Sequence, residues 1–243
     1  MTWYKEWFNS ENYIKVYKHR DESEAIRLVE LIERNINFQN NTTVLDMACG
    51  AGRHAIEFAK KGFNVTAVDL SSRLLNEAKK NAVNEGVSIE FVLSDILEFE
   101  TKSKFALVAN LFTSFGYFEQ DDENYKIVQK AYKLLQEDGY FVLDYFNKEY
   151  LINNLIPTTV FSENGSKIIQ NRALAGNRIV KKITIEKDGS NEEFYESVRL
   201  FTYEEIIDMF KKTGFKITSE FGDYFGTEYN LENSPRLIVI AKR

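Results

Sequence analysis

The sequence has little cysteine, histidine or proline: among 243 residues there are one cysteine, two histidines and two prolines. One cysteine excludes an internal disulfide, and so few histidines give no cluster at the spacing of zinc ligands. No stretch approaches the roughly 18 apolar residues of a membrane span, and the N-terminal segment lacks the apolar core of a signal peptide. We therefore expect no metal, no membrane association and a cytoplasmic location.

An excess of positive charge is also missing. The formal net charge is -6 and the pI is near 5.2. Binding a nucleic-acid backbone draws on dense patches of lysine and arginine, so we expect no nucleic-acid partner and favour small or neutral-to-cationic substrates. What is present is hydrophobic residue content of 44%, which is enough for one large core with additions.

Short apolar strands alternate with helices from Thr43 onward, a pattern typical of a parallel sheet. The amphipathic segment before them, 22–36, is expected to be a helix that lies against this sheet. Asp121 is expected to cap the last helix of the series and Gly139 to end it. We predict strands over 43–47, 63–68, 88–93, 104–110 and 140–146, and helices over 52–61, 72–84 and 122–136.

Residues 157–200 break this rhythm. Alternating polar and apolar residues surround turn signals at Asn164-Gly165, Gly176-Asn177 and Asp188-Gly189, which predicts an antiparallel ribbon. A helix over 203–213 and strands near 215–221 and 237–241 follow. We predict an N-terminal helical cap over 1–38, a core over 39–156 and 199–243, and an insertion over 157–198 that forms a lid or a homodimer surface.

The stretch 44–54 is the most informative part of the chain, because a buried strand runs through a loop of small residues into a helix. Such a turn lets the backbone approach a nucleotide closely. Gly50-x-Gly52-x-x-Ala55, with Asp69 standing 17 residues after Gly52, satisfies the dinucleotide fingerprint. A nicotinamide cofactor is therefore one interpretation.

The wider pattern Asp46-x-Ala48-x-Gly50-x-Gly52 resembles the S-adenosylmethionine-binding loop of class I methyltransferases. The closing order of a helix, a strand and a terminal strand is also similar to the end of that sheet. The resemblance implies an α/β, Rossmann-like sheet of seven strands, mostly parallel with the last strand antiparallel. Ala48 departs from the family, which often has glycine there. In detail, Ser114 to Phe118 and Ser234-Pro235-Arg236 look like bacterial small-molecule methyltransferases.

The resemblance also implies which residues bind the cofactor. Asp69 would accept both ribose hydroxyls, and Asp95 would contact the adenine amine; the alternative for each is a helix or loop cap. Cys49 is interpreted as a small loop residue and not as a nucleophile, since His54 does not obviously reach it. The full predicted set is Asp46, Ala48, Cys49, Gly50, Gly52, Asp69, Leu70, Asp95, Ile96 and Asn110.

Methyl transfer from a sulfonium to a small-molecule oxygen or nitrogen mainly needs alignment and exclusion of water, and a general base only for some acceptors. Three arginines in the ribbon, and Arg236, are either anion ligands or solvated charges. A non-catalytic S-adenosylmethionine-binding module remains a further alternative. The candidates for a base are Asp144, Tyr145 and Asn147 after the fifth strand, and Tyr13, Tyr17 and Arg20 from the cap. The three arginines of the ribbon are Arg172, Arg178 and Arg199.

Overall fold

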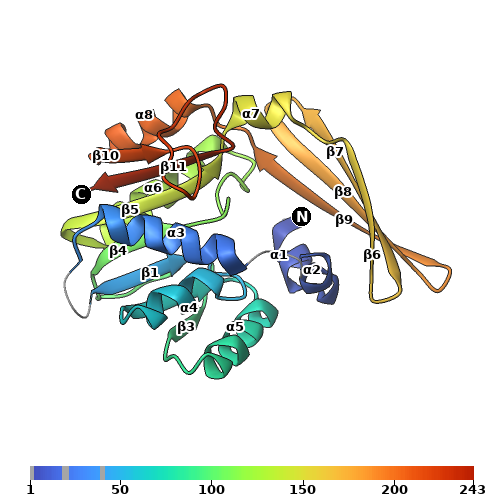
Figure 1. Cartoon of the computed structure of the whole chain (residues 1–243), viewed down its shortest axis with the longest axis horizontal. Helices are drawn as coiled ribbons and strands as arrows, with labels where there is room; N and C mark the ends of the chain where they lie inside the picture. Colours follow the sequence, from blue (N-terminus) through green and yellow to red (C-terminus); the bar gives the residue numbers. More distant parts are fainter. Residues whose placement is uncertain (1–2, 18–21, 39–41) are drawn as a thin grey trace.

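The computed structural model describes residues 3–17, 22–38 and 42–243 and contains two β-sheets (Figure 1). The large sheet has seven strands in the order β10-β11-β5-β4-β1-β2-β3. β1 to β5 run parallel, and β11 is antiparallel to both of its neighbours, which confirms the predicted sheet. The strands are β1 (Thr43–Met47), β2 (Asn64–Asp69), β3 (Glu90–Leu93), β4 (Phe105–Asn110), β5 (Leu135–Phe146), β10 (Lys216–Phe221) and β11 (Arg236–Lys242).

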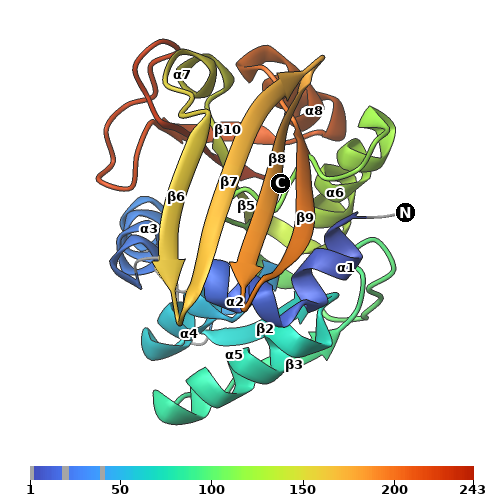
Figure 2. The same ribbon diagram turned by 90° about the vertical axis from the view of Figure 1, so that its right-hand side faces the viewer.

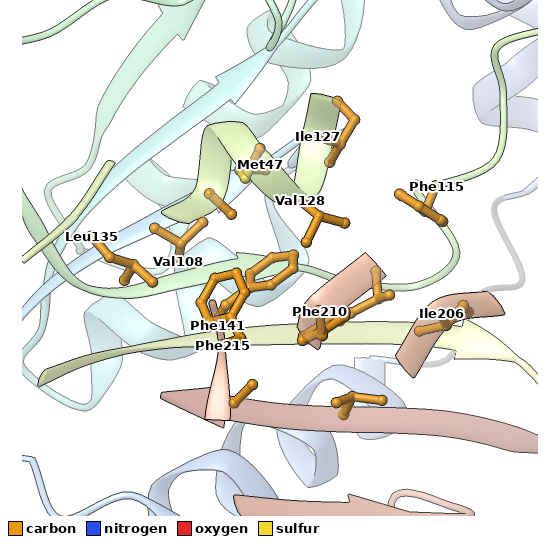
Figure 3. Close-up of a cluster of buried hydrophobic side chains, with 14 of the residues drawn as sticks. Met47, Val108, Phe115, Ile127, Val128, Leu135, Phe141, Ile206, Phe210 and Phe215 are labelled. Atoms are coloured by element: carbon orange, nitrogen blue, oxygen red, sulfur yellow. The ribbon is translucent and has the colours of Figure 1, made fainter. Parts of the chain in front are cut away.

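Helices cover both faces of the large sheet, because its central strands are apolar on both sides. One core joins β-strand residues to α6 (Asp121–Leu134) and α8 (Tyr203–Thr213) and contains the stacked rings of Phe141, Phe210 and Phe215 (Figure 3). The other core joins the sheet to α3 (Glu22–Asn35), α4 (Arg53–Lys60) and α5 (Ser72–Asn84). Helix α3 therefore lies against the sheet as predicted.

The start and end of α6 differ from the prediction. Its N-cap is Gln120, and Asp121 is the first helical residue, because the Asp121 carboxylate is engaged by the Arg199 guanidinium at 3.0 Å. The helix ends at Leu134 and passes directly into β5, so Gly139 lies within the strand. In contrast, α8 has the predicted bounds, fixed by a capping box at Thr202 and a left-handed C-cap.

The small sheet, β6–β9, is the predicted antiparallel ribbon. Its strands are β6 (Thr158–Glu163), β7 (Ser166–Ala175), β8 (Arg178–Lys187) and β9 (Ser190–Arg199), hydrogen-bonded in that order (Figure 2). Positive φ angles at Asn164-Gly165 and at Asp188-Gly189 make two of its hairpin turns tight, and Gly176 provides the third. β6 is linked to β5 by α7 (Lys148–Asn153).

Two short helices, α1 (Trp3–Asn9) and α2 (Glu11–Val16), lie between the two sheets (Figure 1). Trp7 and Val16 pack with Ile168, Ile183 and Ile185 of the small sheet in a third apolar cluster. The predicted cap therefore divides into α1 and α2, which face the small sheet, and α3, which packs on the large one. The domain bounds and the homodimer stay predictions. In the described ranges, no helix is long and apolar enough to cross a membrane.

Candidate functional site

The turn after β1 uses small residues because its backbone adopts conformations that favour glycine. Ala48, Gly50 and Gly52 have φ angles of 59°, 57° and 83°. A Cβ on Gly52 would lie 2.9 Å from the Ala78 Cβ in α5, whereas a Cβ on Gly50 would meet nothing within 4 Å. Gly52 thus permits close packing of two helices, and Gly50 leaves open space beside the turn. Ala48 fits by size, but its conformation costs an L-residue about 1–2 kcal/mol.

Asp69 connects this turn to the end of β2. Its Oδ2 accepts a hydrogen bond from the Gly50 backbone N–H at 2.8 Å, and its Oδ1 accepts one from Ser71 N–H at 2.8 Å. The cap of α5 is Ser71, whose Oγ accepts from Leu74 N–H at 3.1 Å. Asp69 is therefore not the helix cap, and each carboxylate oxygen retains a lone pair for a hydroxyl donor.

Asp46 is a buried carboxylate beneath the turn, and its Oδ2 has no hydrogen-bond partner among the described residues. Burial, and then the nearby Asp69 charge, raise the pKa of Asp46 to about 8, although the Ala55 backbone hydrogen bond opposes them. Burial and the same two carboxylates raise the pKa of the Cys49 thiol well above its ordinary value. Cys49 is therefore a poor nucleophile, whereas the Asp46 carboxylate is available to a hydrogen-bond donor or a cation of a ligand.

Asp95 and Asn110 have different surroundings. Asp95 Oδ1 accepts from Leu97 N–H at 3.1 Å, and its Oδ2 lies 3.7 Å from Lys5 Nζ. Asn110 is fully buried and donates to the carbonyls of Met47 and Ser114 at 3.4 and 3.2 Å. Asn110 therefore supports the turn from below.

These strand ends surround a cavity of about 290 Å³, which we call the strand-end cavity. Of the predicted cofactor residues, those that line it are Asp46, Ala48, Cys49, Gly50, Asp69, Leu70, Asp95 and Ile96. Among the described lining residues, Arg53 is the one lysine or arginine, and five are acidic: Glu22, Asp46, Asp69, Glu77 and Asp95. The cavity therefore favours a ligand that carries positive charge.

A strained turn follows β4, where Phe112 and Thr113 have φ angles of 53° and 63°. Asp144 Oδ2 accepts from Phe112 N–H at 2.8 Å, and the Asp144 carbonyl accepts from Thr113 N–H at 2.9 Å. Arg236 donates to Thr113 Oγ1 at 2.9 Å and lies 2.7 Å from Asp144 Oδ1. This buried ion pair holds the turn, so Asp144 is not placed as a general base and Arg236 is not a solvated charge.

The other base candidates at the end of β5, Tyr145 in the strand and Asn147 just after it, are also engaged in structural contacts. Asn147 accepts from Glu149 N–H at 3.1 Å and donates to the carbonyls of Leu231 and Ser234 at 2.7 and 2.9 Å. The Tyr145 hydroxyl donates to the Arg199 carbonyl. Among the described residues, neither Tyr145 nor Asn147 borders the strand-end cavity. Polar groups at these strand ends satisfy buried backbone carbonyls and amides instead. Of the cap candidates, Arg20 lies outside the described residues.

A second cavity, of about 490 Å³, lies against the inner face of the small sheet, and we call it the small-sheet cavity. Its walls come from α1 and α2, the strained turn, α7 and all four strands of the small sheet. Asp144, Tyr145 and Asn147 are not among its described lining residues. Five residues line both cavities, so the two cavities are adjacent and share a wall. The shared residues are Phe8, Tyr13, Tyr17, Phe112 and Tyr117.

The polar side of this wall joins Tyr17, a predicted base candidate, to Glu196 and Lys181, which the sequence analysis missed. The Tyr17 hydroxyl donates to Glu196 Oε1 and accepts from Lys181 Nζ at 2.7 Å. Lys181 also lies 2.7 Å from Glu196 Oε2, and Trp7 Nε1 donates to Glu196 at 2.7 Å. Burial alone would raise the pKa of Glu196, but the Lys181 ammonium and these hydrogen bonds hold it below its ordinary value. Tyr17 thus sits between an ionised carboxylate and an ammonium.

Residues 44–139 match the family model described as a methyltransferase domain. A provisionally named methyltransferase of Geobacillus sp. (strain WCH70) is 30% identical over 219 residues, covering 84% of this chain and 86% of that protein. An S-adenosylmethionine-dependent methyltransferase from Clostridium acetobutylicum ATCC 824 has a TM-score of 0.79 at 21% identity, over 95% of this chain and 96% of the other. The amino pentose methyltransferase CalS10 of Micromonospora echinaspora, solved with S-adenosylmethionine, has a TM-score of 0.69 at 19% identity, over 96% and 97% of the two chains.

The fold is therefore that of the class I methyltransferases. The chain belongs to the S-adenosylmethionine-dependent methyltransferase family, and S-adenosylmethionine is its cofactor. Two observations of the site fit this cofactor. The acidic lining suits its sulfonium and ammonium groups, and the unpartnered Asp46 oxygen suits a charged donor. The family decides against the nicotinamide interpretation of the glycine turn.

Proposed function

We propose that this protein methylates an oxygen or nitrogen of a small molecule that binds in the small-sheet cavity. The observation that carries the proposal is the wall of five residues shared by the two cavities. A donor in one cavity and an acceptor in the other would meet across Tyr17 and Phe112. The similarity of the fold to an amino pentose methyltransferase supports a small-molecule acceptor.

On the donor side, Asp69 would accept the ribose hydroxyls, while Asp95 and Ile96 would border the adenine. Asp46 would balance the positive charge near the turn, directly or through water. When bound, S-adenosylmethionine supplies a methyl group on a positively charged sulfur, which needs no further activation. The chain's task is then to align the acceptor and to exclude water.

On the acceptor side, the base candidates that line both cavities are Tyr13 and Tyr17, and Tyr17 is chosen because its hydroxyl hydrogen-bonds to both Glu196 and Lys181. Its hydroxyl donates to the Glu196 carboxylate, which stays ionised, and its remaining lone pair would accept a hydrogen bond from the hydroxyl or ammonium of a methyl acceptor and align it. Lys181 holds the tyrosine oxygen in place. The aromatic residues of the shared wall would keep bulk water away from the reacting atoms.

The proposal is tested in two stages. In thermal shift assays, S-adenosylmethionine at about 100 times its dissociation constant should add roughly 2.7 kcal/mol of stability, and NADH should add none. A screen with methyl-labelled S-adenosylmethionine over amines, phenols, carboxylates and sugars should then show transfer to at least one class. Donor binding without transfer to any class would favour a non-catalytic binding module.

A further inference from the structure

The three arginines of the small sheet have different surroundings. Arg199 lies 3.0 Å from Asp121 and 2.7 Å from Glu205, so its charge is neutralised. Arg178 donates to the carbonyls of residues 116, 117 and 118 and fastens the small sheet to the core. Of the three, Arg172 alone is among the described lining residues of the small-sheet cavity. Only Arg172 is therefore placed to meet a ligand there.

The hydrogen-bond partners of Arg172 are neutral. Its guanidinium donates to the Ile156 carbonyl at 3.4 Å, to Thr159 Oγ1 at 3.2 Å and to Gln170 Oε1. These contacts fix the plane of the guanidinium and use at most three of its five N–H donors. The carboxylate among the described lining residues is Glu196, which already binds Lys181, Tyr17 and Trp7. The charge of Arg172 therefore has no counter-ion in the described wall.

The register of the small sheet sharpens this imbalance. Arg172 of β7 is directly opposite Lys181 of β8, which is directly opposite Glu196 of β9. The three residues form one cross-strand row, and all three line the small-sheet cavity. Like charges placed directly opposite each other destabilise a sheet, and a single carboxylate offsets only one of the two cations. A second negative group, supplied by a ligand, would balance the charge of the row.

We propose that the methyl acceptor carries an anionic group, a carboxylate or a phosphate, which Arg172 binds. The aromatic and aliphatic side chains around the row, such as Phe146, Ile179 and Val198, would contact the apolar part of the same molecule. The planar guanidinium suits both anions because it donates two parallel hydrogen bonds. This inference rests on the proposed function, since it names the acceptor class of the same site.

The test measures binding without methyl transfer. With the strand-end cavity saturated by S-adenosylhomocysteine, calorimetry compares benzoate and phenyl phosphate with neutral benzamide. The wild type should bind one of the anions at least about tenfold more tightly than benzamide, and Arg172→Gln should remove that preference. Lys182→Gln is the matched control, because this substitution removes the same charge from the opposite face of the sheet. Lys182 follows Lys181 in β8 and pairs with Glu193. Lys182→Gln should keep the preference.

The outcomes separate the two proposals. Equal affinity for benzamide and both anions, or an anion preference that survives Arg172→Gln, overturns the inference. A preference lost equally in Lys182→Gln also overturns it, because the effect would then be one of overall charge. In the label-transfer screen, methylation of anionic acceptors with a KM raised about tenfold or more by Arg172→Gln supports it. Anion binding through Arg172 with no transfer to any acceptor contradicts the proposed function instead.

Discussion

The two cavities of this methyltransferase differ in charge. Among the described lining residues, the strand-end cavity has five acidic side chains and one basic one, and the small-sheet cavity has two basic side chains and one acidic. They also differ in construction, because the strand ends of the large sheet contribute to the first, whereas all four strands of the small sheet contribute to the second. The difference indicates that the two cavities suit ligands of opposite charge, which agrees with the proposal that the donor binds in the first and the acceptor in the second.

Asp69→Ala, in the strand-end cavity, should have the largest effect on the affinity for S-adenosylmethionine. It removes the acceptor of two backbone hydrogen bonds and of the proposed ribose contacts, so the affinity for S-adenosylmethionine should fall about 300-fold. Arg172→Gln, in the other cavity, should change that affinity by less than about twofold. Calorimetric titration of both variants measures the contrast. Comparable losses in the two would mean that the ribose site is misplaced.

Tyr17→Phe tests the wall where the cavities meet. Without its hydroxyl, the link from an acceptor to Glu196 is broken, so kcat should fall about 100-fold while the donor dissociation constant changes by less than about threefold. Tyr195→Phe is the control, since Tyr195 is an exposed tyrosine on β9 of the small sheet and lines neither cavity among the described residues. Steady-state kinetics on the acceptor found in the screen provides both constants. An unchanged kcat would remove Tyr17 from the reaction.

The pH dependence of donor binding should show whether Asp46 ionises when S-adenosylmethionine binds. The pKa of Asp46 is about 8 in the folded protein against an ordinary 3.8. The stability of the free protein therefore falls as pH rises from 3.8 toward 8. A cationic ligand favours the ionised form, and binding below pH 8 then releases a proton. The affinity for S-adenosylmethionine should therefore rise by up to about tenfold per pH unit from pH 6 to 8.

The control for this dependence is Asp46→Asn, which cannot ionise. Its donor affinity should be weaker at pH 8 and nearly constant across the same range. Calorimetry in buffers of different ionisation enthalpy counts the released proton directly. A flat wild-type profile, or a slope that persists in Asp46→Asn, would assign the charge balance to another group.

Ala48→Gly should have the smallest effect. Because Ala48 has a φ of 59°, glycine should raise the free energy of unfolding by about 1 kcal/mol and the Tm by roughly 2–4 °C. Ala51→Gly, in the same turn at a residue without positive φ, should give no such gain. Thermal unfolding of both variants makes the comparison. A loss of stability in Ala48→Gly would mean that the methyl group, and not the backbone, governs this position.

The strand-end cavity was largely predictable from sequence. In parallel strands the carboxyl ends meet at one edge, so Asp46, Asp69 and Asp95 were expected together, and the structure places all three on the strand-end cavity. Polar residues of β5 were not predictable in the same way. Asp144 lies at a strand end like the others, but the choice between catalysis and support depends on Arg236, which lies far away in the chain.

The small-sheet cavity was harder, because no local pattern brings α2 to face β8 and β9. One signal was nevertheless present. Two-residue turns at Gly176-Asn177 and Asp188-Gly189 fix the register of the hairpins, and counting back from them pairs Arg172 with Lys181 and Lys181 with Glu196. The cross-strand row was therefore contained in the sequence, whereas its position over Tyr17 depends on tertiary packing.

A crystal structure with S-adenosylhomocysteine tests the two-cavity account most directly. The account predicts ribose hydroxyls within hydrogen-bond distance of Asp69 and a sulfur atom that faces the shared wall at Tyr17 and Phe112. The small-sheet cavity should remain accessible from that sulfur. A sulfur enclosed by protein on every side, with no passage to the small-sheet cavity, would contradict it.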